Sequence, residues 1–85
     1  MTAPRLTLLG KPGCHLCDDA RAIVREVAGE RGIAFEELDI LRDEALLARY
    51  AEEIPVLLID DRVHAVWRVD ADRLRSALDE REVRA

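Results

Sequence analysis

The sequence feature that most limits the fold is the pair Cys14 and Cys17, which lie two residues apart in the stretch Lys11–Cys17. An apolar run at 6–9 comes directly before this stretch, and the residues after it have apolar positions at helical spacing. Two intervening residues in the first turn of a helix bring two thiols within reach of a disulfide bond. A C-x-x-C between a strand and a helix indicates a dithiol redox site.

The two thiols are expected to differ in reactivity. Cys14 falls at the start of the predicted helix, where free N–H groups and the positive end of the helix dipole favour a thiolate. Such settings lower the pKa of a cysteine from ~8.5 to roughly 3.5–7.5. Lys11 adds a positive charge nearby. Cys17, one turn into the helix, is expected to be less exposed, so we predict that Cys14 attacks first and Cys17 closes the disulfide.

The cysteines have two other interpretations. A structural zinc site needs four ligands, and the only other soft ligands are His15 and His64. His15 lies between the cysteines and would point away from them on a helix, and His64 is far along the chain. We therefore expect no metal site. Inert cysteines are the remaining alternative to a redox dithiol.

Composition predicts one small domain over residues 1–85. Hydrophobic residues make up 49% and charged residues 36%, as in a compact α/β unit. The net charge is −5, and the basic residues are dispersed among acids, so nucleic acid is not an expected partner. No apolar run reaches membrane-spanning length and the N-terminus lacks the apolar region of a signal peptide. We expect a cytoplasmic monomer without membrane contact.

Apolar periodicity and turn residues predict alternating strands and helices, in the order β-α-β-α-β-β-α. The run 6–9 is apolar throughout, as in a central strand buried on both faces. We expect a four-stranded mixed sheet with helices on both faces. The predicted elements are a strand at 5–9, a turn at 10–13, a helix at 16–27 ended by Gly29 and Gly32, an edge strand at 33–40, a helix opened by Asp43, a strand at 56–59, a turn at 60–62, a strand at 63–69, a helix capped by Asp70, and a fraying tail at 79–85.

Alternation along 63–69 assigns side chains to the two faces of the last strand. Trp67 is predicted to pack in the core, on the same face as Val63, Ala65 and Val69, whereas His64 is predicted to face solvent. Two further side chains receive structural interpretations: Tyr50 as core and Asp18 as a helix-start acid rather than a group that tunes the thiols. None of these residues is therefore expected in the site.

Lys11, Cys14 and Cys17 after a first strand resemble the active site of the glutaredoxin branch of the thioredoxin-like superfamily. The resemblance covers nearly the whole chain and implies the thioredoxin-like fold. It also implies that Ile54–Pro55, directly before a strand, is a cis-proline element beside Cys14. The proline ring would place no competing donor against the sulfurs, and the backbone of Ile54 would pair with an extended substrate segment.

The resemblance implies a thiol–disulfide oxidoreductase that reduces protein or small-molecule disulfides and binds no cofactor. Glutathione or a reductase would return the pair to the dithiol, with Lys11 holding a carboxylate of glutathione and Asp70 or Asp72 its amine. The chain departs from the family at Val66–Arg68, where glutaredoxins carry Gly-Gly, and at His15-Leu16, where they usually have an aromatic residue. The alternative function is an iron–sulfur cluster or metal carrier that uses Cys14.

His15 is predicted to favour the Cys14 thiolate, because a cation beside a thiol stabilises its charged form. We expect His15→Ala to raise the pKa of Cys14, measured as the pH dependence of thiol alkylation. An unchanged or lower pKa would remove this role.

Overall fold

The computed structural model describes residues 3–84, with side chains through residue 81, and confirms the predicted order of elements. Two α-helices and one 3₁₀ turn (η1) connect strands, and a third α-helix follows the last strand. None of the helices in this range is long and apolar enough to cross a membrane. The elements are β1 (Leu6–Gly10), α1 (His15–Glu30), β2 (Phe35–Asp39), η1 (Ile40–Arg42), α2 (Glu44–Tyr50), β3 (Val56–Ile59), β4 (Arg62–Val66) and α3 (Ala71–Arg84).

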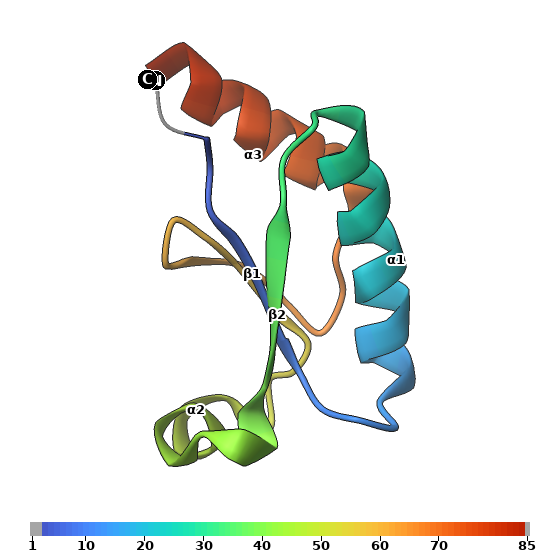
Figure 1. Cartoon of the computed structure of the whole chain (residues 1–85), viewed down its shortest axis with the longest axis vertical. Helices are drawn as coiled ribbons and strands as arrows, with labels where there is room; N and C mark the ends of the chain where they lie inside the picture. Colours follow the sequence, from blue (N-terminus) through green and yellow to red (C-terminus); the bar gives the residue numbers. More distant parts are fainter. Residues whose placement is uncertain (1–2, 85) are drawn as a thin grey trace.

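The four strands form one mixed sheet in the order β2-β1-β3-β4 (Figure 1). β1 is parallel to β2 and antiparallel to β3, and β3 is antiparallel to β4. The sheet therefore has β1 inside and β2 at one edge, as the apolar run of β1 and the charges of β2 predicted.

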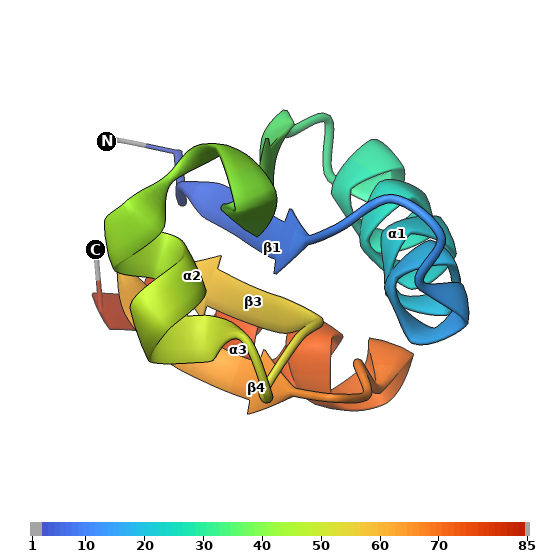
Figure 2. The same ribbon diagram turned by 90° about the horizontal axis from the view of Figure 1, so that it is seen from below.

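Helices cover both faces of the sheet, as predicted. Leu6 and Leu8 of β1 pack on one face against buried residues of α1 and α3, such as Val24 and Leu74. Leu9 belongs to a second cluster on the other face, together with buried residues of η1, α2 and β3. Figure 2 shows the strands between α1 on one side and α2 on the other. Alternation along β1 thus divides its side chains between two cores.

Side-chain caps begin the helices where the sequence predicted them. The Asp43 carboxylate accepts hydrogen bonds from the N–H groups of Ala45 (3.0 Å) and Leu46 (3.1 Å) at the start of α2. Asp70 accepts one from the N–H of Arg73 (2.9 Å) at the start of α3. Each bond satisfies a backbone donor that has no partner inside the helix.

Two helices extend beyond their predicted ends. α1 continues through Gly29 to Glu30, and the left-handed residue is Gly32, at φ +64°. α3 continues to Arg84, so the prediction of a fraying tail from residue 79 was wrong for 79–84; Ala85 lies outside the described residues. Asp79 of α3 forms an ion pair with Arg31 (2.7 Å), which holds this turn of α3 against the end of α1.

The last strand is shorter than predicted and is interrupted by a bulge. Leu57 pairs with Ala65 whereas Leu58 pairs with Val63, so His64 is an extra residue in β4. The bulge breaks the predicted alternation, and β4 ends at Val66. The core assignment of Trp67 was wrong: its side chain is 55% exposed.

Thr7 carries a buried hydroxyl in β1. Its Oγ1 has no hydrogen-bond partner within the described part of the chain. A buried polar group without a partner costs about 1–3 kcal/mol. We expect Thr7→Val, which replaces the hydroxyl with a methyl of similar size, to raise the free energy of unfolding in urea by about 1 kcal/mol. Thr7→Ser keeps the hydroxyl but loses a buried methyl group, so it should lower the free energy of unfolding. A less stable Thr7→Val would show that the hydroxyl is bonded.

Candidate functional site

The ends of all four strands bring the predicted site residues to one edge of the sheet. Gly10, the last residue of β1, pairs with Asp39 at the end of β2, and Leu9 pairs with Val56 at the start of β3. Val56 in turn pairs with Val66 at the end of β4. The segments 11–14 and 67–70, which follow β1 and β4, and the segment 54–55, which precedes β3, therefore lie at the same end of the strands. This is the lower end of the sheet in Figure 1.

Cys14 and Cys17 form a disulfide, with 5.1 Å between their Cα atoms. The Cys14 sulfur is the N-cap of α1 and accepts a hydrogen bond from the N–H of Cys17 (3.2 Å). Cys14 is half-buried, whereas Cys17 is 1% exposed. A thiolate at Cys14 would be stabilised by this N–H donor and by the positive end of the helix dipole. The arrangement presents one sulfur to a partner and shields the other.

Gly10 is a site residue that sequence reasoning missed, because it was assigned to the turn at 10–13. It is the last residue of β1, and a Cβ at this position would lie 3.0 Å from the Cys17 sulfur. The strand can approach the dithiol this closely only without a side chain. The single sequence signal was a glycine directly before the C-x-x-C stretch.

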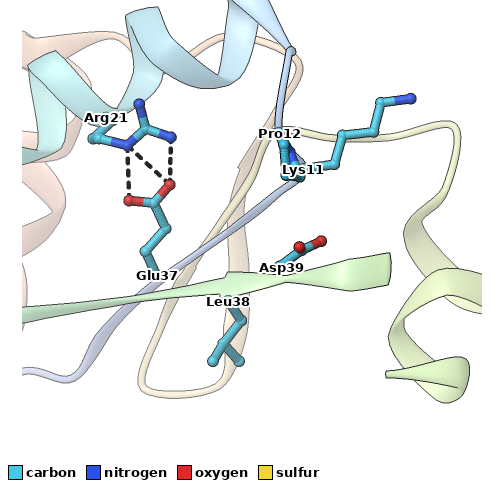
Figure 3. Close-up of a pocket in the computed structure, with 6 residues that line it drawn as sticks. All are labelled: Lys11, Pro12, Arg21, Glu37, Leu38 and Asp39. Atoms are coloured by element: carbon cyan, nitrogen blue, oxygen red, sulfur yellow. Dashed lines mark hydrogen bonds and ion pairs between the residues drawn. The ribbon is translucent and has the colours of Figure 1, made fainter. Parts of the chain in front are cut away.

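Lys11 lies at a shallow hollow of about 350 Å³ beside the start of α1. Figure 3 shows the Lys11 side chain extending away from an ion pair between Arg21 and Glu37. The Arg21 guanidinium is 2.6 Å from a Glu37 carboxylate oxygen and 2.8 Å from Asp18. These hydrogen bonds, Glu37 first, raise the pKa of Arg21. The Asp18 carboxylate is thus engaged with Arg21, consistent with its structural interpretation.

The peptide bond between Ile54 and Pro55 is cis, the isomer that the resemblance implied. Pro55 is buried, and its carbonyl oxygen accepts a hydrogen bond from the N–H of Trp67 (2.8 Å). Within residues 3–84, neither the N–H nor the C=O of Ile54 has a backbone hydrogen-bond partner. Ile54 therefore offers a free backbone edge at the end of the sheet where the dithiol lies.

The remaining predicted site residues have different surroundings. His15 is exposed as the first residue of α1. The Asp70 carboxylate caps α3 through the N–H of Arg73. Asp72 pairs with Arg75 (3.0 Å) and lines a hollow on the α3 side of the sheet. Among the described residues, no group of three or more His, Cys, Asp or Glu side chains is placed to hold a metal ion.

His64 is half-buried rather than solvent-facing, because the bulge in β4 turns it toward α3. It lines a hollow of about 470 Å³ together with Asp72, Arg73 and Glu80, besides the small side chains of Ser76 and Ala77. Burial, and then the charge of Arg73, lower the pKa of His64 below its usual 6.5. The folded protein thus binds this proton less readily than the unfolded chain does.

The lowered pKa of His64 makes stability depend on pH. As the pH falls through 6.5, the unfolded chain takes up the proton first, so the free energy of unfolding decreases toward the lower pKa of the folded state. We expect His64→Gln to remove this part of the decrease in urea denaturation between about pH 7.5 and 5. An unchanged slope in the variant would contradict this assignment.

Comparisons with known proteins agree with this fold. Residues 5–79 match the family described as Glutaredoxin-like domain. The chain is 31% identical over 81 residues to Rv0508 of Mycobacterium tuberculosis. The aligned region covers 89% of this chain and 84% of that protein. The structure of XcR50 from X. campestris is 37% identical with a TM-score of 0.73, over 88% of this chain and 96% of that one.

Thioredoxin from Fasciola hepatica shares the fold at 18% identity, with a TM-score of 0.63 over 92% of this chain and 80% of that one. The thioredoxin-like fold is therefore shown by structure. The cysteine pair lies inside the segment that the family covers. On the strength of that match, the chain belongs to the glutaredoxin-like domain family.

Proposed function

We propose that this protein is a thiol–disulfide oxidoreductase that reduces protein or small-molecule disulfides through Cys14 and Cys17. The observation that carries the proposal is the difference between the two sulfurs: Cys14 is partly exposed at the N-terminus of α1, and Cys17 is 1% exposed behind it. Reduction of a disulfide by a dithiol needs one accessible thiol that attacks the substrate and a second thiol that breaks the mixed disulfide. Membership of the glutaredoxin-like family supports redox chemistry of this kind.

The reaction begins when the Cys14 thiolate attacks one sulfur of a substrate disulfide. The substrate S–S bond breaks, a mixed disulfide forms with Cys14, and the departing thiolate takes up a proton. Cys17 then loses its proton and attacks the Cys14 sulfur, which releases the second substrate thiol. Two electrons have passed to the substrate, and the protein holds the Cys14–Cys17 disulfide. An external thiol donor, glutathione or the dithiol of a reductase, returns it to the reduced state.

Backbone groups around the dithiol support this cycle. The N–H of Cys17 already donates to the Cys14 sulfur, and it would stabilise the thiolate each time that sulfur is released. Ile54 has a free backbone edge at the same end of the sheet, which could pair with an extended substrate segment. Pro55 has no N–H to compete for the sulfurs.

The test is turnover of a small mixed disulfide with glutathione and glutathione reductase, in wild type and in Cys14→Ser. A parallel assay with dithiothreitol as donor removes the dependence on glutathione. We expect reduction faster than the donor alone gives in at least the dithiothreitol assay, and only the uncatalysed rate in Cys14→Ser. A wild-type protein that adds nothing to the uncatalysed rate with either donor would refute the proposal. Coloured, iron-containing purified protein would favour the cluster carrier instead.

A further inference from the structure

A second hollow, of about 280 Å³, lies directly beside the dithiol between α1 and the segment that follows β4. We call it the Leu16–Trp67 groove. Leu16, which lines the groove, is one of the two residues between the cysteines, so the groove adjoins the redox site. Five of the seven lining residues are apolar, namely Leu16, Ala20, Ile23, Trp67 and Val69, and the other two are the charged residues Asp19 and Arg68.

Two large apolar side chains of the groove are open to solvent. Leu16 is 42% exposed and Trp67 is 55% exposed, whereas Ala20 and Val69 are buried beneath them. A large apolar surface exposed beside a reactive group indicates a binding surface rather than a core residue out of place. Its volume falls below the ~300–1,000 Å³ of pockets for small molecules and suits one or two side chains.

Trp67 is exposed but held in a fixed position. Its backbone N–H donates to Pro55 (2.8 Å) and also contacts the carbonyl of Glu53 (3.3 Å). Its indole Nε1–H donates to the carbonyl of Glu52 (3.0 Å). The residue has φ +65°, a conformation uncommon for a bulky side chain. The fold therefore holds an aromatic wall beside the dithiol at a cost in backbone conformation, as a preorganised contact surface would require.

Two charges at the groove are unengaged. Neither Asp19 nor Arg68 has an ion-pair partner among the described residues. A carboxylate can accept from a peptide N–H and a guanidinium can donate to a peptide carbonyl. The two groups could therefore bind a polypeptide backbone whose apolar side chain occupies the groove.

We propose that the Leu16–Trp67 groove selects polypeptide disulfides in which an apolar side chain flanks the reacting cysteine. The proposal rests on the proposed function and specifies its substrate class. The occupant is an extended protein segment, because the groove accepts a side chain while Ile54, in the 52–55 segment that Trp67 contacts, offers a free backbone edge. Glutathione has no apolar side chain and would leave the exposed faces of Leu16 and Trp67 uncovered.

The test uses the full chain, fully reduced, in single turnovers that need no external donor. Three substrates each carry the same 5-thio-2-nitrobenzoate leaving group: a peptide with leucine beside its cysteine, the same peptide with serine there, and glutathione. Since the leaving group is shared, the ratio of rate constants cancels changes in the intrinsic reactivity of Cys14. The variants are Trp67→Gly, which also relieves the positive φ, and Leu16→Ser. Leu41→Ser is the matched control, since Leu41 is 56% exposed and does not line the groove.

We expect wild type and Leu41→Ser to prefer the leucine peptide over the serine peptide and over glutathione by about tenfold. The ratio of the rate constant for the leucine peptide to that for the serine peptide should fall to near one in Trp67→Gly and Leu16→Ser. Trp67 is the only tryptophan, so its emission should shift to shorter wavelength in a complex of Cys17→Ser with the leucine peptide.

Three results would overturn the inference. They are equal wild-type rates for the two peptides, a leucine preference that survives in both groove variants, and glutathione reacting as fast as the leucine peptide. Each would leave the proposed function intact, since nitrobenzoate is still released. Release from none of the three substrates would refute the proposed function, and the inference with it.

Discussion

Cys17→Ser is expected to accumulate as a covalent mixed disulfide with its substrate, whereas Cys14→Ser should form none. The reason lies in the burial of the two sulfurs: Cys14 is half-buried at the N-terminus of α1, and Cys17 is 1% exposed beneath Gly10. Without Cys17, the bond between Cys14 and the substrate has no internal thiol to break it. Mass spectrometry of the intact protein under non-reducing conditions measures the adduct directly.

Alkylation of the single-cysteine variants provides the control. In Cys14→Ser, iodoacetamide can reach Cys17 only when the structure opens. An opening that costs about 2.8 kcal/mol exposes the thiol roughly 1% of the time, so we expect the reaction to be roughly a hundredfold slower than in Cys17→Ser. Urea should remove the difference. Equal alkylation rates in the folded variants, or an adduct on Cys14→Ser, would contradict the assignment of roles.

The order of elements and the helix caps could be predicted because their signals are local. The apolar run of β1, the amphipathic spacing of α1, and the caps Asp43 and Asp70 each depend on residues within one or two turns. The C-x-x-C pair is equally local, so its spacing before a helix was enough to predict that the two sulfurs lie within disulfide reach. The placement of the sheet strands then followed from which runs are apolar throughout and which carry charge.

The predictions that were wrong concern features that depend on contacts between residues far apart in the sequence. The bulge at His64 is one extra residue in the pairing of β3 with β4, and the sequence of β4 carries no mark of it. That residue takes Val63 out of the predicted alternation. Trp67 lies outside because β4 ends at Val66 and Trp67 has φ +65°, and it becomes a wall of the groove. The end of α3 is likewise held by a partner far along the chain, the ion pair of Asp79 with Arg31.

Gly10→Ala is expected to destabilise the protein although it adds only one methyl group to a strand. The new Cβ would lie 3.0 Å from the Cys17 sulfur and 3.2 Å from the Cys17 Cβ, closer than side chains normally approach. Cys17 belongs to α1 and is 1% exposed, so it has little room to move away. Overpacking of a buried site costs about 1–3 kcal/mol. For a domain of this size, each kcal/mol lowers Tm by roughly 4–8 °C.

Gly29→Ala is the matched control, since Gly29 lies inside α1 and an added Cβ would meet nothing within 4 Å. There the methyl group should raise stability by about 0.5–1 kcal/mol, because alanine loses less conformational freedom in a helix. The same chemical change is thus expected to act in opposite directions at the two glycines in thermal unfolding. Because the added methyl at residue 10 presses on the resolving thiol, Gly10→Ala should also slow closure of the Cys14–Cys17 disulfide. A Gly10→Ala protein as stable as wild type would show that α1 can move away from β1, and the close approach would then not explain the glycine.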